Sequence, residues 1–220
     1  WTNVSCASCH LEGGDDAHIW SFPDGPRQTP ALAGRKIKDT SPYHWSGEFS
    51  DAQKFMVHTI KERMGGTAFD TNKEMDNMID FIESLPVPQN ANLKTVRTDA
   101  QLRGAQAYQK AECGSCHTGA LLTNRESRDV GTIVTAKNGG LRAVDNGLVT
   151  KFVTGSSDRV GFDVPSLIGI ARTAPYLHTG GQLSLTARVN DGNAKHGRVD
   201  LLNTQEKADL VEYLKTFETT

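Results

Sequence analysis

Two short stretches carry the residues best suited to chemistry in this chain of 220 residues, Cys6-Ala-Ser-Cys9-His10 and Cys113-Gly-Ser-Cys116-His117. Cys-x-x-Cys-His is the attachment sequence of c-type haem. The two thiols add to the vinyl groups of the haem, and the adjacent imidazole binds the iron from one side. Because the two motifs use all four cysteines of the chain, the repetition favours two covalently bound haem c groups over a zinc half-site or paired thiols.

The length and charge of the chain fit this interpretation. About 100 residues per haem are enough for two small domains. The net charge of −2 and the absence of a basic cluster give no indication of nucleic-acid binding. No run of 18 or more apolar residues indicates a membrane span. Covalent haem attachment occurs outside the reducing cytoplasm, so we expect an exported protein in a bacterial periplasm that exchanges electrons with an unidentified redox partner protein.

The pattern of apolar residues predicts a mainly α fold with long loops and little β structure. We expect two cytochrome c-like domains, each built around one covalent haem c, at residues 1–88 and 89–220. The predicted helices are 51–63, 71–85, 98–111, 184–189 and 203–217, and those at 51, 71, 98 and 203 begin with apparent capping boxes, Ser50/Gln53, Thr71/Glu74, Thr98/Gln101 and Asn203/Glu206. The Gly-, Asp- and Pro-rich segment 11–27 predicts a loop. Segments 130–135 and 148–154 could pair around the Asn146-Gly147 turn signal.

The two halves differ at their N-terminal ends. A helix precedes the second haem motif, whereas only five residues precede Cys6, and no signal peptide is visible there. We therefore expect either that an upstream helix has been removed or that the chain is the C-terminal part of a larger protein.

An internal repeat relates the two halves and predicts their second axial ligands. Superposing Glu74 on Glu206, an offset of 132, brings the apolar positions of the two terminal helices into register. The same offset places Met64 on His196. Both residues precede the last helix of their half by seven positions, where a cytochrome c fold places its second axial ligand.

We therefore predict His10 and Met64 as the axial ligands of the first haem, and His117 and His196 as those of the second. The remaining methionines lie at helical spacing among apolar neighbours and are interpreted as core residues: Met56, Met75 and Met78. All four methionines lie in the first half, so the second haem has no thioether ligand available. His178 is the alternative ligand there. A His/Met haem has a higher reduction potential than a bis-histidine haem, so the two haems are expected to be inequivalent.

Around Trp45 and the segment Thr173-Ala-Pro175-Tyr-Leu-His178-Thr-Gly180, the chain resembles the bacterial di-haem cytochrome c peroxidase/MauG superfamily. Pro165-Ser-Leu167 matches the Pro-Thr/Ser-Leu that precedes this segment in the family, and His44-Trp45-Ser46-Gly47 is similar to its Phe-Trp-Asp-Gly. The resemblance covers nearly the whole chain except the N-terminal helix of the family. It implies that Trp45 lies between the haems and carries electrons from one to the other.

The resemblance also implies a calcium ion between the two domains and a displaceable histidine on the N-terminal haem. Gln28, Thr173 and Pro175 match the calcium positions, although Gln28 stands where the family often has asparagine. His18 resembles the displaceable histidine and is the alternative ligand of the first haem. The second haem lacks the methionine usual in the family, and only Glu62 lies near the position of its peroxide-cleaving glutamate.

Three functions remain open at this point. The chain could transfer electrons between two six-coordinate haems, or it could be a hydrogen-peroxide-reducing or MauG-like oxidoreductase with one open or labile haem. It could also be the electron-transfer module of a larger protein or complex. The identity of the second ligands separates the first two functions.

Overall fold

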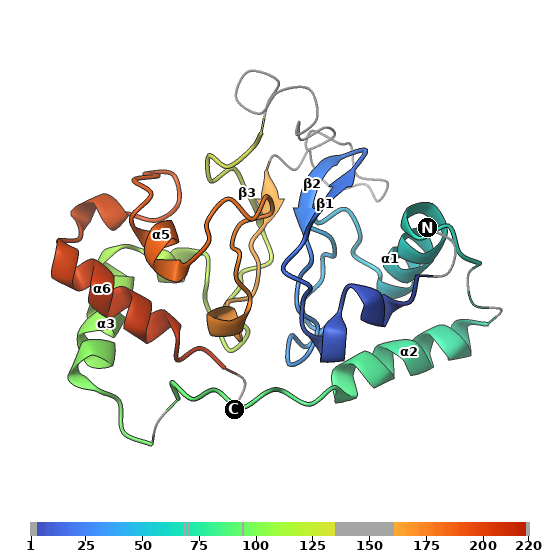
Figure 1. The fold of residues 1–220 in the computed structure, drawn as a ribbon, viewed down its shortest axis with the longest axis horizontal. Coiled ribbons are helices and arrows are strands. Elements are labelled where there is room, and N and C mark those ends of the chain that lie inside the picture. The colour runs from blue at the N-terminus through green and yellow to red at the C-terminus, as the bar shows by residue number, and fades with distance from the viewer. Residues whose placement is uncertain (1–3, 68, 70, 94, 135–160, 219–220) are drawn as a thin grey trace.

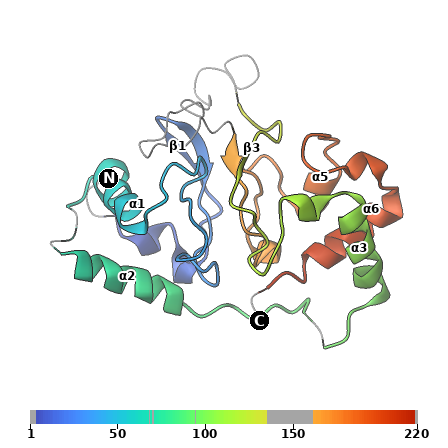
Figure 2. The ribbon, with the colours of Figure 1, turned by 180° about the vertical axis from the view of Figure 1, so that it is seen from behind.

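A computed structural model describes residues 4–67, 69, 71–93, 95–134 and 161–218 of the chain (Figure 1). The described part is mainly helical and contains little strand, which confirms the predicted fold class at that level. The helices α1 and α2 and the hairpin of β1 and β2 lie on one side of the molecule, and α3, α5 and α6 lie on the other (Figures 1 and 2).

The regular elements are short and separated by long irregular segments. The α-helices are α1 Ala52–His58, α2 Asn72–Ser84, α3 Asp99–Lys110, α5 Leu185–Val189 and α6 Thr204–Leu214. The strands are β1 Ile19–Phe22, β2 Gly25–Gln28, β3 Ser127–Arg128 and β4 Phe162–Asp163, and β1–β2 and β3–β4 pair antiparallel. Single turns of 3-10 helix occupy Cys6–Ser8, Leu11–Gly13, Cys113–Ser115, Ile170–Arg172 and Val199–Leu201, and Thr59–Arg63 forms a π-helix.

Local side-chain chemistry sets the starts of the longer helices. Three of the predicted capping boxes are present, at Thr71/Glu74, Thr98/Gln101 and Asn203/Glu206. In each, the N-cap side chain accepts from the N3 backbone N–H and the N3 side chain accepts from the N-cap N–H, which satisfies two otherwise unpaired donors. The predicted Ser50/Gln53 box is wrong. Asp51 caps α1 instead and accepts a hydrogen bond from the Lys54 N–H at 2.8 Å.

The predicted helix over 51–63 also changes character at its end. After His58 the chain widens into the π-helix Thr59–Arg63, and the Met64 N–H bonds to the Thr59 carbonyl five residues earlier at 3.0 Å. Single π turns occur frequently at functional sites because they insert one residue and redirect the side chains that follow. Met64, the predicted iron ligand, is the residue that ends this turn.

The segment 11–27, predicted as a loop, contains all but the last residue of the β1–β2 hairpin. Ile19 pairs with Gln28 and Phe22 with Gly25, so Pro23 and Asp24 form the turn. Pro-Asp-Gly is a turn signal with a mechanism, since proline presets φ and glycine accepts φ above zero. Gly25 has a φ of 115°. The other predicted hairpin involves residues 135 and 148–154, which lie outside the described residues.

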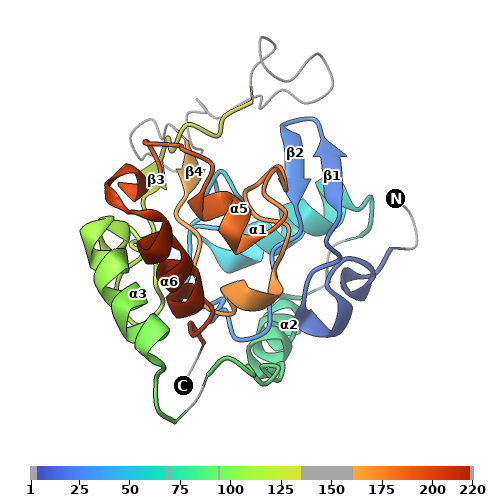
Figure 3. The same cartoon turned by 60° about the vertical axis from the view of Figure 1, so that its left-hand side comes forward.

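Buried side chains gather into two hydrophobic clusters, one in each half of the sequence. The first contains Ile37, Tyr43, Met56, Met75, Ile79 and Ile82. The second contains Ala107, Tyr108, Ala111, Tyr176, Leu185, Val189, Leu202, Leu210, Val211 and Phe217, and is centred on the crossing of α3 and α6 (Figure 3). The three methionines interpreted as core residues are therefore confirmed as packed: Met56 and Met75 belong to the first cluster, and Met78 packs against it. The division at residue 88 stays a prediction.

The two halves meet through a pair of equivalent loops. In the first loop, Tyr43 forms an isolated antiparallel β-bridge with Phe49, and its hydroxyl donates to the Ile37 carbonyl at 2.8 Å. In the second loop, Tyr176 forms the same bridge with Gln182, and its hydroxyl donates to the Ile170 carbonyl at 2.9 Å. This duplication, with an offset of 133, extends the internal repeat into the tertiary structure. It places Trp45 and His178 at equivalent positions in the two loops.

Candidate haem-binding sites

The second haem motif borders a large apolar cavity. The cavity has a volume of about 570 Å³, and Cys113, Cys116 and His117 line it together with side chains from both halves of the chain. Helix α3 delivers the motif, and the Tyr108 hydroxyl donates a hydrogen bond to the His117 carbonyl at 2.5 Å. A concave, mostly apolar space of this size with a few polar groups is typical of a cofactor site.

His117 is oriented for metal binding. Its Nδ1 lies 3.3 Å from the Leu122 carbonyl and 3.1 Å from the Pro165 carbonyl. Two acceptors fix the proton on Nδ1 and leave the lone pair of Nε2 free, which is how ligating histidines are usually held. Burial lowers the pKa of His117 to about 4, against an opposing effect of these carbonyls. The ring is therefore neutral at physiological pH.

His196 faces His117 across the cavity. The two ring centroids are 6.3 Å apart and the ring planes are inclined by 32°. The loop that carries His196 is held to the end of α3, two residues before Cys113, by the Arg198 N–H, which donates to the buried Ala111 carbonyl at 2.8 Å. Burial, followed by the charge of Arg188, lowers the pKa of His196 to about 3, so this ring too is neutral.

The distance between these rings tests whether a haem iron fits. Metal–imidazole nitrogen bonds are about 2.0–2.1 Å, and a ring nitrogen lies about 1.1–1.2 Å from the ring centroid, so two axial imidazoles have centroids about 6.2–6.6 Å apart. The observed 6.3 Å lies within this range. Together with the apolar cavity and the two thiols, the residues at this site fit a covalent haem c between His117 and His196.

Arg188, which contacts His196, was not predicted from the sequence as a residue of this site. Arg188, at the end of α5, donates from Nε to His196 Nδ1 and from Nη2 to the His196 carbonyl, both at 3.1 Å. Its Nη1 lies 2.6 Å from Asp191 Oδ2, an ion pair without the alignment of a hydrogen bond. Arg188 is 12% exposed. The residues meet through an irregular loop, so no periodicity in the sequence could indicate this contact.

His178, the alternative second ligand, lies elsewhere in the same cavity wall. It is 1% exposed, and its ring stacks on Phe162 with centroids 3.8 Å apart. The Trp45 ring lies 6.2 Å from the His178 ring, and the Trp45 Nε1–H donates to the Gln28 carbonyl at 2.8 Å. The three aromatic rings of Trp45, His178 and Phe162 thus form a packed contact between the two halves.

The first haem motif is built differently. His10 Nδ1 is buried without a hydrogen-bond partner. Burial lowers the pKa of His10, although the backbone of Gly14 and Pro30 opposes the effect. Burial and the neighbouring Asp16 raise the pKa of the Cys9 thiol. An imidazole beside two free thiols is the donor set that the motif requires, so the residues fit the attachment of a haem.

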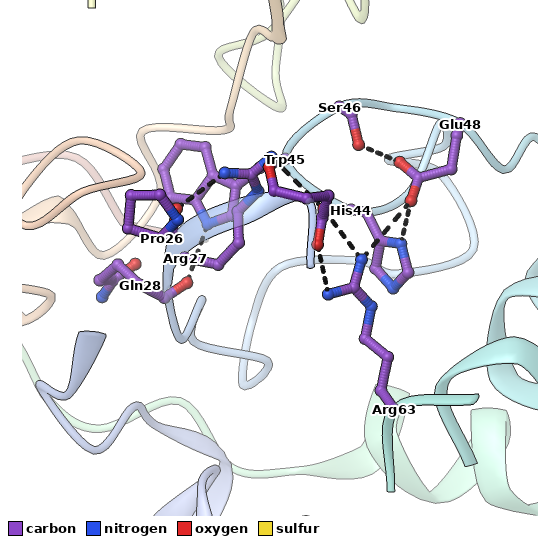
Figure 4. A network of polar contacts seen from close by, with 9 residues as sticks. Pro26, Arg27, Gln28, His44, Trp45, Ser46, Glu48 and Arg63 are labelled. Carbon is purple, nitrogen blue, oxygen red and sulfur yellow. Dashed lines mark hydrogen bonds and ion pairs between the residues drawn. The ribbon is translucent and has the colours of Figure 1, made fainter. Parts of the chain in front are cut away.

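Met64 is half-buried and follows a residue that is firmly anchored. Arg63 lies 4.0 Å from Glu48 (Figure 4). It donates from both terminal nitrogens to the Asp24 carboxylate at 3.0 Å and stacks 4.4 Å from the Phe22 ring. Burial alone would raise the pKa of Asp24, but the hydrogen bonds and charge of Arg63 outweigh it and lower the pKa. Neither Met64 nor His10 is among the described residues that line the large cavity.

The remaining predicted residues occupy two places. His18 is exposed and packs edge-on against Trp20. Gln28, Thr173 and Pro175 all line the large cavity, and Gln28 Nε2 is buried without a partner. In the part of the chain that the structure describes, no cluster of three or more His, Cys, Asp or Glu side chains is arranged to hold a metal ion. Backbone carbonyls would have to supply most ligands of a calcium ion here.

No protein-family model matches the chain. The gamma subunit of hydrazine synthase from Kuenenia stuttgartiensis is 28% identical over 97% of this chain and 72% of its own length. The cytochrome c551 peroxidase of Nitrosomonas europaea is 24% identical over 97% of this chain and 73% of its length. The cytochrome c peroxidase of Escherichia coli is 30% identical over 52% of this chain and 26% of its length.

Solved structures show the same fold. A chain of Kuenenia stuttgartiensis hydrazine synthase, in a crystal pressurised with xenon, matches 98% of this chain and 81% of its own length, with a TM-score of 0.78 and 24% identity. A MauG-like protein associated with microbial copper homeostasis matches 99% of this chain and 83% of its own, with a TM-score of 0.71 and 22% identity. Sequence and fold together confirm the resemblance noted in the motifs: the chain is similar in sequence to a hydrazine synthase subunit and to cytochrome c peroxidases, and in fold also to a MauG-like protein.

Proposed function

We propose that the chain is a di-haem c-type cytochrome that transfers electrons between two inequivalent haems in a cytochrome c peroxidase/MauG-like redox system. The observation that carries this proposal is the facing pair His117 and His196 beside Cys113 and Cys116 in one apolar cavity. Covalent haem c attachment supports a periplasmic location. Within the described residues, none of the helices is long and apolar enough to cross a membrane.

Each part of the chain has a defined task in this proposal. Haem c supplies a one-electron iron couple when it is bound. Cys6, Cys9 and His10 would hold the first group, and Cys113, Cys116 and His117 would hold the second. Met64 and His196 would supply the second iron ligands, with His18 and His178 as the alternatives. The carbonyls of Leu122 and Pro165 keep the His117 Nε2 lone pair directed away from the protein backbone and available to iron.

Trp45 connects the two sites in the proposed transfer of electrons. Its indole lines the cavity of the second site and is fixed to the first half by the hydrogen bond to Gln28. Its ring centroid lies 6.5 Å from that of Phe162 and 6.2 Å from that of His178, so aromatic side chains of the two halves approach each other at this point. A calcium ion bound through Gln28, Thr173 and Pro175 would hold the same interface together, and we propose it as a structural ion.

The intact mass of the exported protein tests the proposal. We expect the mass of the polypeptide plus two haems, and an absorption spectrum of haem with two thioether bonds at each motif. Replacing Cys113 and Cys116 with alanine should remove one haem, as should the matched Cys6 and Cys9 pair. A parent protein that carries no covalent haem after export with the haem-attachment machinery would refute the assignment.

A second function is favoured by the relatives, two of which are named peroxidases. Hydrogen peroxide reduction needs one haem with an open or displaceable sixth site. Addition of hydrogen peroxide to the half-reduced protein should then consume peroxide and produce a ferryl spectrum. Without either, the electron-transfer function stands.

A third function follows from the relative named as a subunit. The chain would then be the electron-transfer module of a larger protein or complex, and its redox partner would be an upstream domain or a separate subunit. Purification of the native protein under mild conditions should yield a particle heavier than the chain with two haems. A monodisperse particle of 220 residues would contradict this function.

A further inference from the structure

The two histidines that face each other at the second site are held in opposite hydrogen-bonding states. His117 Nδ1 lies against two carbonyl oxygens, which accept but cannot donate. The proton of His117 is therefore on Nδ1, and Nε2 carries a lone pair. This ring is prepared to bind a metal.

His196 is held by a donor instead. Arg188 Nε is 3.1 Å from His196 Nδ1, and a guanidinium has five N–H donors and no acceptor. The hydrogen bond therefore requires a lone pair on Nδ1 of His196. The neutral ring then carries its proton on Nε2, the only nitrogen left to face His117. In this state His196 has no lone pair for an iron.

The hold of Arg188 on His196 is firm. The guanidinium contacts the ring and the carbonyl of the same residue, and Asp191 anchors its remaining nitrogen. Asp191 is itself fixed by the Asn193 N–H at 2.9 Å and by Gln182 Nε2 at 3.3 Å. Hydrogen bonds that involve a charged group are about twice as strong as neutral ones. Iron and Arg188 therefore compete for the same ring.

From this geometry we infer that Arg188 makes His196 a displaceable ligand of the second haem, so that a small ligand can take its position on the iron. This inference rests on the proposed haem at that site. Binding of His196 to the iron would require its proton on Nδ1 instead of Nε2 and would break the hydrogen bond with Arg188 Nε. Release of His196 would return the proton to Nε2 and let that bond re-form. The ring would carry one proton in both states, so no net proton or electron would be exchanged.

The ligand that replaces His196 is expected to be a small molecule whose atoms accept a hydrogen bond. A released His196 presents Nε2–H toward the cavity, and Arg188 lines the same cavity with a positive charge. Both features favour an anionic or oxygen-containing ligand such as cyanide, nitrite or hydroperoxide over a neutral apolar gas. The first site has no such arrangement by sequence, since the offset of 133 that relates the duplicated loops and the N-caps of α1 and α5 places Phe55 where Arg188 stands.

The test compares the parent with Arg188→Met in the ferric, haem-loaded protein, with cyanide as the probe. Removing the competing donor should strengthen His196 ligation, so the low-spin bis-histidine signal in electron paramagnetic resonance should grow. Cyanide affinity at the second site should fall by about tenfold or more, the equivalent of one hydrogen bond to a charged group. Arg198→Met is the matched control, because it removes the same charge from an exposed ion pair two residues from His196.

A double variant, Arg188→Met with Asp191→Asn, covers the case in which the unpaired Asp191 carboxylate prevents folding of the single variant. It should behave in the same way. Tighter cyanide binding or a larger high-spin fraction in the Arg188 variants would show that Arg188 supports ligation and would overturn the inference. A response equal to that of the Arg198 variant would overturn it too. A mass with only one haem would instead contradict the proposed function.

Discussion

The crossing of α3 and α6 depends on a single glycine, and replacing it gives a sharp test of the structure. A Cβ on Gly104 would lie 2.1 Å from the Asp209 carbonyl oxygen and 2.6 Å from Tyr213 Cβ. Carbon–oxygen contacts of about 3.3 Å are the ordinary limit, so the helices would have to separate by about 1 Å. The contacts are with backbone and Cβ atoms, which cannot move away by a change of side-chain rotamer.

Two effects of opposite sign determine the size of the change. Alanine is a better helix former than glycine by about 1 kcal/mol. Overpacking of a well-packed core costs about 1–3 kcal/mol, occasionally more, and here the separation also loosens Ala107, Tyr108 and Leu210. We take the upper end, so Gly104→Ala should lower the free energy of unfolding by about 2 kcal/mol. For a chain of this size that corresponds to a fall of about 4–8 °C in Tm.

Thermal unfolding of the haem-loaded protein, followed by far-UV circular dichroism, measures this change. Gln106→Ala is the control, because Gln106 is exposed on the same helix and such surface changes usually stay within about 0.5 kcal/mol. An unchanged or raised Tm for Gly104→Ala would refute the close crossing of the helices. The consequence for function would be local, since α3 leads directly into Cys113.

Three further predictions concern the first site, the interface and the acid stability. Met64→Ala should abolish the far-red sulfur-to-iron charge-transfer band of the oxidised protein while both haems stay attached, and Met78→Ala should leave it; a persisting band would exclude Met64 as the ligand. Trp45→Phe should slow electron transfer between the haems in flash photolysis, and an unchanged rate would show that electrons take another path. The same variant should lower the free energy of unfolding by about 1–3 kcal/mol, because it leaves the Gln28 carbonyl without its hydrogen-bond donor. The Arg103 hydrogen bond lowers the pKa of Asp209 below its ordinary 3.8, so its stabilising contribution is complete above that pH and is lost as the pH falls through the lowered value. Asp209→Asn should therefore be less stable than the parent at pH 7, with a difference that shrinks below about pH 4 in denaturant titrations.

Features with local causes were predictable from the sequence. The capping boxes at Thr71, Thr98 and Asn203 depend on residues three positions apart, and the inner helix faces depend on a fixed period. The start of α1 was misplaced by one residue because Ser50 and Asp51 are both good caps, and the neighbouring backbone selects between them. The β1–β2 hairpin was missed although Pro23-Asp24-Gly25 is a turn signal, because its strands are only four residues long.

Features produced by contacts between distant segments were not predictable. The π turn before Met64 places Arg63 against Asp24, 39 residues away. The hydrogen bonds from Arg188 to His196 likewise depend on how an irregular loop folds back on α5. The internal repeat predicted His196 as the partner of His117, and the 6.3 Å between their rings supports that assignment. It could not predict the donor behind the ring, since the repeat has no counterpart of Arg188.

The interface between the halves brings together two residues that the repeat makes equivalent, Trp45 and His178. Trp45 and His178 occupy equivalent positions in two equivalent loops, and each loop presents its ring to the other half. The Gln28 N–H donates to the His178 carbonyl at 2.7 Å and the Asp163 N–H donates to the Trp45 carbonyl at 2.8 Å, so hydrogen bonds between the halves hold the backbone of both residues. The contact between the two candidate sites is therefore built from the duplicated element itself. A protein in which each haem worked alone would have no need to place its duplicated loops ring to ring, and this arrangement favours a function in which the two sites act as a pair.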